Sequence, residues 1–227
     1  MSTVILVPRR DDGGERDALW AFARKHWEGM GVPIFCGDHL DGPFNRGAGI
    51  NTAAKLAGDW DTAIIIDSDV LIELAKVSLA VECAQRFQRV VHPFREYHAL
   101  TPGGTKAIMN GFSGNWKGHV KYTWWINMSC CVVVPRSVWN EVGGFDERFV
   151  GWGWEDVAFI QSTDCLTGNH LRFYGDLWHL YHHRSPENNH ASPLYNASKV
   201  LATRYIESRY DPDAMRSLLR EPGGPRS

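Results

Sequence analysis

The chain has 227 residues, of which 44% are hydrophobic and 22% charged, and this composition is typical of a globular protein with a full core. A formal net charge of −2 excludes a global basic field that would draw the chain to nucleic acid or to an anionic membrane. The five cysteines do not have the spacing of a zinc finger, and the sequence shows neither a signal-peptide pattern nor an apolar stretch of membrane-spanning length. These features favour a cytoplasmic protein with reduced thiols.

Short apolar strands alternate with helices over the first 92 residues. Residues 4–7 predict a buried strand that ends at Pro8. The later elements of this half are expected as a helix over 15–29, a strand over 32–36, a helix over 46–57, a strand over 63–66 and a helix over 73–87. Such alternation predicts parallel βαβ units and a Rossmann-like half over residues 1–92.

The pattern changes after Pro93. Residues 94–125 have no clear period, so we expect an irregular segment. The remaining elements are expected as a strand over 130–134, a helix over 135–142, a glycine-rich loop, a helix over 155–165, strands over 171–174 and 177–182, and a helix over 197–209. We therefore predict one α/β domain over residues 1–210, with a mixed, mainly parallel central sheet flanked by helices. Its second half covers 93–195, and a C-terminal helix and flexible tail occupy 211–227, with 221–227 disordered.

Two carboxylates, Asp67 and Asp69, directly follow a short apolar strand, at the point where that strand leaves the sheet. In open α/β sheets, ligands bind beyond the carboxyl ends of the strands. Mg²⁺ and Mn²⁺ prefer oxygen ligands and can clamp a diphosphate that the two acids would otherwise repel. We interpret the pair as a metal- and nucleotide-sugar-binding corner; the alternative is that both are ordinary turn residues at a strand end.

A second acid pair, Glu155 and Asp156, follows a loop rich in glycine and tryptophan. Activation of a hydroxyl acceptor needs a carboxylate base that is shielded from bulk water. Trp152 and Trp154 can supply this shielding and a stacking face for a sugar ring. The alternative is that the acids only stabilise a helix N-terminus while the tryptophans pack in the core.

Three imidazoles, those of His179, His182 and His183, lie within five residues of one another. Imidazole supplements carboxylate better around Mn²⁺ than around Mg²⁺, so this segment is a candidate source of metal ligands. The sequence does not decide which of the three bind metal. A zinc site of three histidines is a weaker alternative because no HExxH or CxxC spacing accompanies them.

Arg9, Arg10 and Arg46 are candidate contacts to phosphate or base, because guanidinium presents a fork to phosphate oxygens. Their alternative is a solvated surface position. The sequence has neither a Walker-type loop nor a GxGxxG after the first strand, which disfavours an ATPase and a dinucleotide-dependent dehydrogenase.

Taken in order, these segments resemble the β-1,4-galactosyltransferase group and related GT-A glycosyltransferases, including chondroitin-polymerase-like domains. The matching motifs are Val-Pro-Arg-Arg at 7–10, Phe-Asn-Arg at 44–46 with Asn51, Asp-Ser-Asp at 67–69, Gly-Gly-Phe at 143–145, Gly-Trp-Gly-Trp-Glu-Asp at 151–156, and two histidines, His179 and His182. The resemblance runs from about residue 4 to 190 and implies a GT-A fold.

The resemblance also implies roles. Asp69, His179 and His182 would hold Mn²⁺ or Mg²⁺. The UDP-sugar would be held by Pro8, Arg10, Phe44, Arg46, Asn51, Asp67, Ser68 and Trp152. Asp156 would be the general base, and Trp154, Glu155 and Asp156 would bind the acceptor. The expected partners are a nucleotide-sugar donor and a glycan, protein or other hydroxyl acceptor.

Three departures from the family pattern affect these expectations. Trp154 replaces a glycine and should reshape the acceptor pocket. Val157 replaces a further acid, which weakens the inference that this chain uses the family's GlcNAc acceptor. A histidine stands where the galactosyltransferases usually have methionine, which should tighten metal binding.

The sequence therefore predicts a metal-dependent, inverting transfer of a hexose from a UDP-sugar to an acceptor hydroxyl. Three alternatives stay open: a retaining enzyme like the polypeptide GalNAc-transferases, a binding module without turnover, and an enzyme that glycosylates DNA bases. The last would need a local basic face near the cleft, for which the candidates are Arg86, Arg89, Arg95, Lys106, Lys117 and Lys121.

Overall fold

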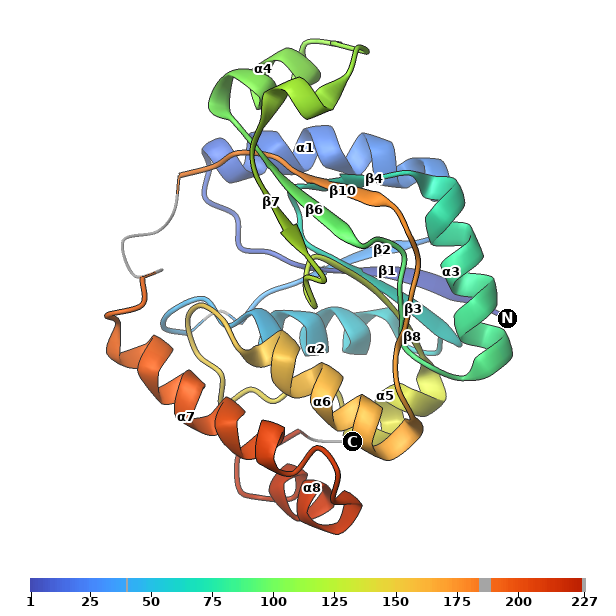
Figure 1. The fold of residues 1–227 in the computed structure, drawn as a ribbon, viewed down its shortest axis with the longest axis vertical. Coiled ribbons are helices and arrows are strands. Elements are labelled where there is room, and N and C mark those ends of the chain that lie inside the picture. The colour runs from blue at the N-terminus through green and yellow to red at the C-terminus, as the bar shows by residue number, and fades with distance from the viewer. Residues whose placement is uncertain (40, 184–188, 226–227) are drawn as a thin grey trace.

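The chain folds around two β-sheets, of six and four strands (Figure 1). We describe a computed structural model of the protein, which covers residues 1–39, 41–183 and 189–225. The larger sheet has the strand order β2-β1-β3-β8-β5-β9. Its strands are β1 (Thr3–Pro8), β2 (Ile34–Gly37), β3 (Thr62–Ile66), β5 (Val91–His92), β8 (Cys131–Pro135) and β9 (Leu171–Arg172). β8 runs antiparallel to β3 and β5, and the other pairs are parallel, so the predicted mixed sheet is confirmed.

The smaller sheet corrects the expectation of an irregular segment over residues 94–125. Its order is β4-β10-β6-β7, formed by β4 (Val70–Ile72), β10 (Asp176–His179), β6 (Glu96–Leu100) and β7 (Val120–Trp125). β6 and β7 pair antiparallel, and α4 (Pro102–Met109) and the short 3-10 helix η2 (Trp116–His119) connect them. The apolar–polar alternation typical of a strand is not visible in this part of the sequence, because both faces of these strands carry aromatic or histidine side chains.

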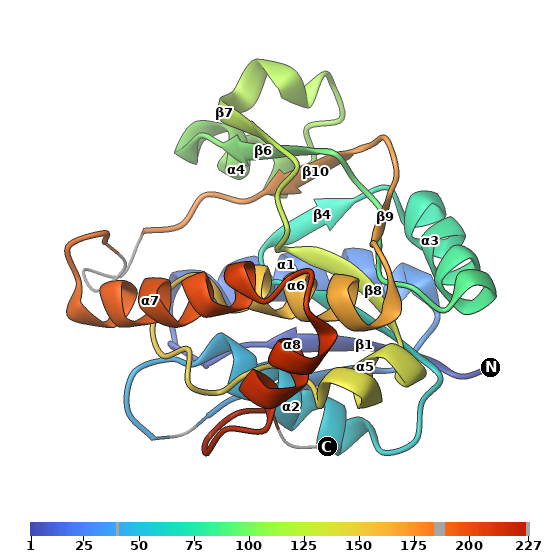
Figure 2. The same ribbon diagram turned by 60° about the horizontal axis from the view of Figure 1, so that its bottom comes forward.

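Helices cover both faces of the larger sheet. On one face lie α1 (Glu15–Trp27), continued by the 3-10 turn η1 (Glu28–Met30), and α3 (Leu74–Phe87). On the opposite face lie α2 (Arg46–Ala57), α5 (Arg136–Val142) and α6 (Glu155–Thr167). Two further helices, α7 (Pro193–Glu207) and α8 (Pro212–Leu219), pack against α6, and Figure 2 shows all five together. The helix expected over 46–57 is confirmed with the same bounds.

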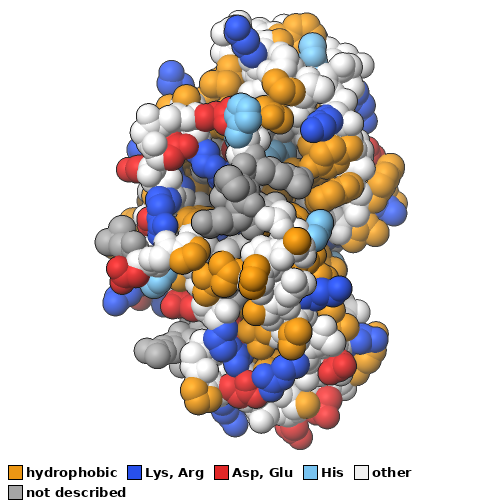
Figure 3. Space-filling model, turned by 90° about the vertical axis from the view of Figure 1, so that its left-hand side faces the viewer, with side chains coloured by type: hydrophobic (Ala, Val, Ile, Leu, Met, Phe, Trp, Pro, Cys, Tyr) orange, Lys and Arg blue, Asp and Glu red, His pale blue; other side chains and the backbone are white. Residues whose placement is uncertain are grey.

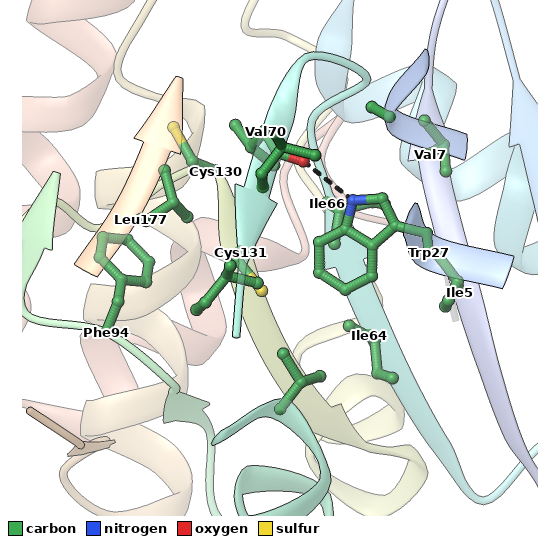
Figure 4. Packing of buried hydrophobic residues seen from close by; sticks show 14 of the residues in the cluster. Ile5, Val7, Trp27, Ile64, Ile66, Val70, Phe94, Cys130, Cys131 and Leu177 are labelled. Carbon is green, nitrogen blue, oxygen red and sulfur yellow. Dashed lines mark hydrogen bonds between the residues drawn. The ribbon is translucent and has the colours of Figure 1, made fainter. Parts of the chain in front are cut away.

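Alternate residues of each central strand enter one of two hydrophobic cores. Ile5 and Ile64 point into the core beneath α1, together with the fully buried Trp27 (Figure 4). Leu6 and Ile65 point into the other core. The indole Nε1 of Trp27 donates a 2.9 Å hydrogen bond to the carbonyl oxygen of Val70, which ties α1 to the start of β4.

Glycines bring α2 close to the ends of β1 and β2. A Cβ atom on Gly37 would lie 2.2 Å from the carbonyl oxygen of Gly49 and 2.4 Å from the amide nitrogen of Ala53. The backbones therefore touch where no side chain fits. At the start of α2, Asn45 Oδ1 accepts a hydrogen bond from the amide of Ala48 and caps the helix. This close contact sets the first turn of α2, and Arg46 with it, beside the carboxyl ends of the strands.

The C-terminal region differs from the expectation in two ways. The predicted helix over 197–209 is α7, which begins earlier, at Pro193. The tail expected to be disordered from residue 221 is placed against the domain through residue 225, because Glu221 forms ion pairs with Arg148 and Arg204. Residues 226 and 227 lie outside the described residues. Within the described chain, no helix combines the length and apolar character needed to cross a membrane.

Candidate functional site

The carboxyl ends of β1 and β3 open into a cleft with a volume of about 1170 Å³. Its walls come from both sheets, the first turns of α1, α2 and α6, and the glycine-tryptophan loop that precedes α6. All of the predicted site residues except Asn51 line this cleft: Pro8, Arg10, Phe44, Arg46, Asp67, Ser68, Asp69, Trp152, Trp154, Glu155, Asp156, His179 and His182.

Asp69, His179 and His182 converge at one point of the cleft. His179 ends β10 and pairs with Val70, the first residue of β4, so β10 lies directly beside Asp69. His179 Nε2 is 3.5 Å from Asp69 Oδ1. The strand ends at this histidine, and the extended segment that follows brings His182 Nε2 to 3.2 Å from Asp69 Oδ2. One ligand atom from each of the three side chains lies within 4.8 Å of the others, a spacing that suits a single cation.

The donor atoms of this triad fit a divalent cation. Asp69 Oδ1 is buried and has no hydrogen-bond partner, so it keeps its lone pairs for a ligand. Burial by itself would raise the pKa of the Asp69 carboxyl, but His179 and His182 hold that pKa well below its usual range. An ionised carboxylate with two imidazoles is a donor set that binds manganese-like ions.

His183, the third candidate ligand, lies apart from the triad. Its side chain is 82% exposed, and its Nδ1 lies 3.0 Å from Glu15 Oε2. Its backbone amide donates to the same carboxylate at 2.8 Å. The geometry therefore separates His183 from the pair formed by His179 and His182, a distinction that the sequence leaves open.

Arg46 connects the two predicted acid pairs. Its Nε donates a 2.8 Å hydrogen bond to Asp67 Oδ1, and its Nη1 lies 3.4 Å from Glu155 Oε1. Burial by itself lowers the pKa of Arg46, but Asp67, Glu155 and Asp156 more than offset this effect and raise it. The Arg46 guanidinium, which is 13% exposed, thus joins Asp67 at the strand end to Glu155 and Asp156 at the helix start in one charge network.

Glu155 and Asp156 occupy the first turn of α6, with Glu155 buried. Burial raises the pKa of Glu155 to about 7, and the neighbouring Asp156 adds to the increase while Arg46 opposes it. Burial also raises the pKa of Asp156. Asp156 Oδ1 accepts a 2.8 Å hydrogen bond from the amide of Val157. A raised pKa makes a carboxylate a stronger base, so both acids are candidates for general-base chemistry.

The glycine-tryptophan loop packs against α7. The rings of Trp152 and Tyr195 stack with their centroids 5.5 Å apart. Trp154 has φ 82°, a backbone region that favours glycine, and this agrees with its position in place of a family glycine. The indole Nε1 of Trp154 is buried without a hydrogen-bond partner. At the other end of the loop, the amide of Gly151 donates to the carbonyl of Phe44, which joins the loop to the segment before α2.

Arg10 and Phe44 line one side of the cleft. The Arg10 guanidinium lies 5.8 Å from the centroid of the Phe44 ring, and its Nε donates a 2.8 Å hydrogen bond to Asp38. Arg9 also lines the cleft, where it pairs with Asp11 and Asp17. Both arginines are therefore held in place by nearby carboxylates.

Asn51 is the one predicted contact to the nucleotide that lies outside the cleft. Its Nδ2 donates to the carbonyl oxygen of Phe145 at 2.8 Å and to Glu147 Oε1 at 2.9 Å, and its Oδ1 accepts from the amide of Phe145 at 2.9 Å. These bonds occupy the side-chain amide and fix the loop that contains Gly144. In the structure Asn51 thus joins α2 to this loop.

Several residues that line the cleft were not predicted as part of the glycosyltransferase site. Arg16, on the first turn of α1, has its Nη2 3.2 Å from His182 Nδ1. Tyr97 and Trp124 form an aromatic wall from β6 and β7, with ring centroids 5.8 Å apart. Lys121 also lines the cleft. The missing signal was the β6–β7 pairing, because only that hairpin reveals which of these side chains face the cleft.

The six basic residues considered for a nucleic-acid surface do not gather at the cleft. Among the described residues that line it, Lys121 is the single member of that set. Lys117 instead lies near Glu96 and Asp176, and Arg95 lies over the ring of Tyr174. On the face drawn in Figure 3, basic and acidic side chains are interspersed. These six residues therefore do not form the local basic face that the DNA-base alternative needs at the cleft.

Comparisons with known proteins agree on one group. The family model for the N-terminal domain of galactosyltransferase matches residues 110–184. Chondroitin sulfate N-acetylgalactosaminyltransferase 1 from Mus musculus is 25% identical over a match that covers 63% of this chain and 28% of that protein. The chain thus spans less than a third of the length of this relative.

Solved structures share the fold. The catalytic domain of Drosophila β1,4-galactosyltransferase 7, in complex with xylobiose, has a TM-score of 0.54 at 19% identity, over 87% of this chain and 79% of that chain. A variant of that enzyme in complex with manganese, UDP-Gal and xylobiose has a TM-score of 0.53 at 18% identity, over 88% and 78% of the two chains. GalNAc-T7, with UDP, GalNAc and Mn²⁺, has a TM-score of 0.54 at 11% identity, over 100% of this chain and 55% of that chain. The GT-A fold predicted from the resemblance is therefore confirmed, and so is the resemblance to the galactosyltransferase group.

Proposed function

We propose that the chain is a divalent-metal-dependent glycosyltransferase that moves a hexose from a UDP-sugar to an acceptor hydroxyl with inversion at the anomeric carbon. One observation carries the proposal: the triad of Asp69, His179 and His182 lines the same cleft as the buried Glu155 and the half-buried Asp156. A cation site beside a shielded carboxylate pair is the arrangement that this chemistry needs.

The donor would lie across the carboxyl ends of β1 and β3. Pro8, Arg10 and Phe44 would bound the nucleoside, and Arg46 and Asp67 would hold the sugar side of the donor. A bound metal would neutralise the charge that builds on the departing diphosphate. Asp69, His179 and His182 would hold that metal. Arg16 has no carboxylate ion pair in the described part of the chain and would add positive charge beside the diphosphate.

Asp156 would act as the general base. Its Oδ1 is engaged by the amide of Val157, which leaves Oδ2 for the proton of the acceptor hydroxyl. The acceptor oxygen would form a bond to the anomeric carbon from the face opposite the departing UDP, as the carbon–phosphate-oxygen bond breaks. Glu155, which lies beside Arg46, would position the acceptor. A single displacement of this kind inverts the anomeric configuration.

The acceptor is proposed to be a carbohydrate. Tyr97, Trp124 and Trp152 present aromatic faces to the cleft, and such faces stack on sugar rings. The unpartnered indole nitrogen of Trp154 would donate a hydrogen bond to a sugar hydroxyl. The Drosophila neighbour binds xylobiose, which supports this class of acceptor. We also propose that the enzyme acts in the cytoplasm, since its five cysteines are unpaired thiols.

The test is a transfer assay with the purified chain. UDP-Gal, UDP-GalNAc and UDP-Glc are each incubated with Mn²⁺ and xylobiose or other short glycans, UDP release is measured, and the product is analysed by proton NMR. We expect UDP release with one donor and a β-linkage from the α-linked sugar. An α-linked product would refute inversion, and no UDP release with any donor and acceptor would refute the enzymatic proposal.

A further inference from the structure

A second cluster of metal-binding side chains lies on the other face of the smaller sheet. Successive residues of a strand point to opposite faces. Tyr97 and His179 face the cleft, so their neighbours Glu96, His98 and Asp176 face away from it. β6 and β10 pair in parallel with Glu96 opposite Asp176, which brings both carboxylates close to one nitrogen of the His98 ring.

The three side chains are close enough to share one ion. His98 Nε2 lies 3.0 Å from Asp176 Oδ1 and 3.6 Å from Glu96 Oε2. One ligand atom from each of the three residues lies within 4.8 Å of the others, the same criterion that the triad in the cleft satisfies. Both carboxylates are partly exposed, so solvent can complete the coordination of an ion there.

The imidazole is fixed in the orientation that a metal ligand needs. His98 is 3% exposed, and its ring stacks on Trp178 with a centroid distance of 4.5 Å. Its Nδ1 lies 2.8 Å from Thr123 Oγ1, on the neighbouring strand β7. A hydrogen bond at one ring nitrogen orients the ring and sets the tautomer, which makes the other nitrogen available as a ligand. His98 Nε2, the nitrogen close to the two carboxylates, is therefore the one available as a ligand.

The local charge also favours a cation. Two carboxylates face one nearby ammonium group, that of Lys117, whose Nζ is 3.6 Å from Asp176 Oδ2 and 4.0 Å from Glu96 Oε2. The Lys117 side chain is 55% exposed and projects from η2. It can move into solvent at little cost when an ion with a higher charge occupies the site.

We propose that Glu96, His98 and Asp176 form a second divalent-cation site, separate from the cleft. One nitrogen and two carboxylate ligands, with solvent in the open positions, suit a first-row divalent cation such as manganese or zinc, and zinc is the probe used below. An ion there would join β6 to β10, the strands whose opposite faces carry Tyr97 and His179. Its role is structural: it stabilises the sheet that forms one wall of the cleft. The proposal does not depend on the proposed glycosyl transfer.

The experiment measures zinc stoichiometry by equilibrium dialysis of the full chain. The double variant Asp69→Ala/His182→Ala removes the cleft site and should retain one zinc ion per chain. Adding Glu96→Gln and Asp176→Asn should abolish that binding. Both substitutions are at partly exposed positions and keep the side-chain shape, and circular dichroism checks the fold.

Two further variants in the cleft-deficient background make the result specific. Lys117→Met removes the competing ammonium, so zinc affinity should increase about tenfold, the size of effect that groups next to a metal site commonly have. Glu141→Gln alters an acid that pairs with Arg216 elsewhere on the surface and should leave zinc binding unchanged. Loss of zinc from the cleft-deficient chain, or zinc retention after Glu96→Gln/Asp176→Asn, would overturn the proposal. Neither outcome bears on transfer by the cleft.

Discussion

Replacement of Arg46 by methionine should destabilise the protein in a manner that depends on pH. The Arg46 side chain is 13% exposed and lies between Asp67 and Glu155, with Asp156 close enough to affect its pKa. Arg46→Met keeps the length of the aliphatic stem and leaves three carboxylates without their shared cation. Loss of one partner from a buried ion pair costs about 3–5 kcal/mol, and because the cleft is partly open to solvent we expect about 3 kcal/mol at pH 8.

The sign of the pH dependence follows from Glu155. Its pKa in the folded protein is about 7, above the ordinary value of 4.5. Between these values the folded state binds more protons than the unfolded state, so this group lowers the free energy of unfolding as the pH rises toward 7. For a pKa raised from 4.5 to about 7, the free energy of unfolding falls by about 3 kcal/mol in total. Without Arg46 the pKa of Glu155 rises further, so the loss continues above pH 7.

The assay is urea unfolding of wild type and Arg46→Met at pH 5.5 and pH 8. At pH 5.5 Glu155 is protonated and no longer needs the charge of Arg46, so the difference in free energy of unfolding should shrink to about 1 kcal/mol. Arg46→Lys keeps the charge and should restore most of the stability at pH 8. Arg148→Met removes a half-buried arginine that pairs with Asp146 away from the cleft, and it should destabilise equally at both pH values. An equal loss for Arg46→Met at the two pH values would refute the reasoning.

Three further outcomes are expected. Asp156→Asn should lower transfer at least about a hundredfold, the usual contribution of a general base, with donor affinity within twofold of wild type by calorimetry; retention of most of the turnover would reassign the base. Asn51→Ala removes three hydrogen bonds and should lower the free energy of unfolding by about 2 kcal/mol without a change in donor affinity; weaker donor binding in the folded variant would return Asn51 to the nucleotide site. Removal of metal by EDTA should abolish UDP release, and Mn²⁺ should restore it; activity that persists in EDTA would exclude a role for the triad of Asp69, His179 and His182.

Local sequence patterns predicted the parts of the site that depend on local structure. Asp67 and Asp69 follow a strand whose apolar run is unmistakable, and Arg46 opens a helix with a clear cap and clear end. The position of an acid after a strand, or of a charge at a helix start, is set by residues within one turn or one strand. These placements therefore required no knowledge of distant contacts.

Local patterns could not show which residues from distant parts of the chain meet at the site. His182 lies beyond the end of β10, so strand periodicity could not give its direction, and the path of the chain after His179 brings it to Asp69. The β6–β7 hairpin was missed, and with it Trp124 and the cluster around His98. Asn51 matched a family motif, yet its side-chain amide is used by the loop at Phe145. A motif gives the type of a residue at a position; tertiary packing decides where its side chain points.

The most direct test of the central claim is calorimetric titration of UDP-hexose with and without Mn²⁺ in wild type, His182→Ala and Glu96→Gln. If Asp69, His179 and His182 hold the metal that binds the donor, wild type and Glu96→Gln will bind the donor with Mn²⁺ and lose most of that affinity without it. His182→Ala will bind weakly in both conditions. Donor binding that is equally strong without Mn²⁺, or unaffected by His182→Ala, would contradict the claim.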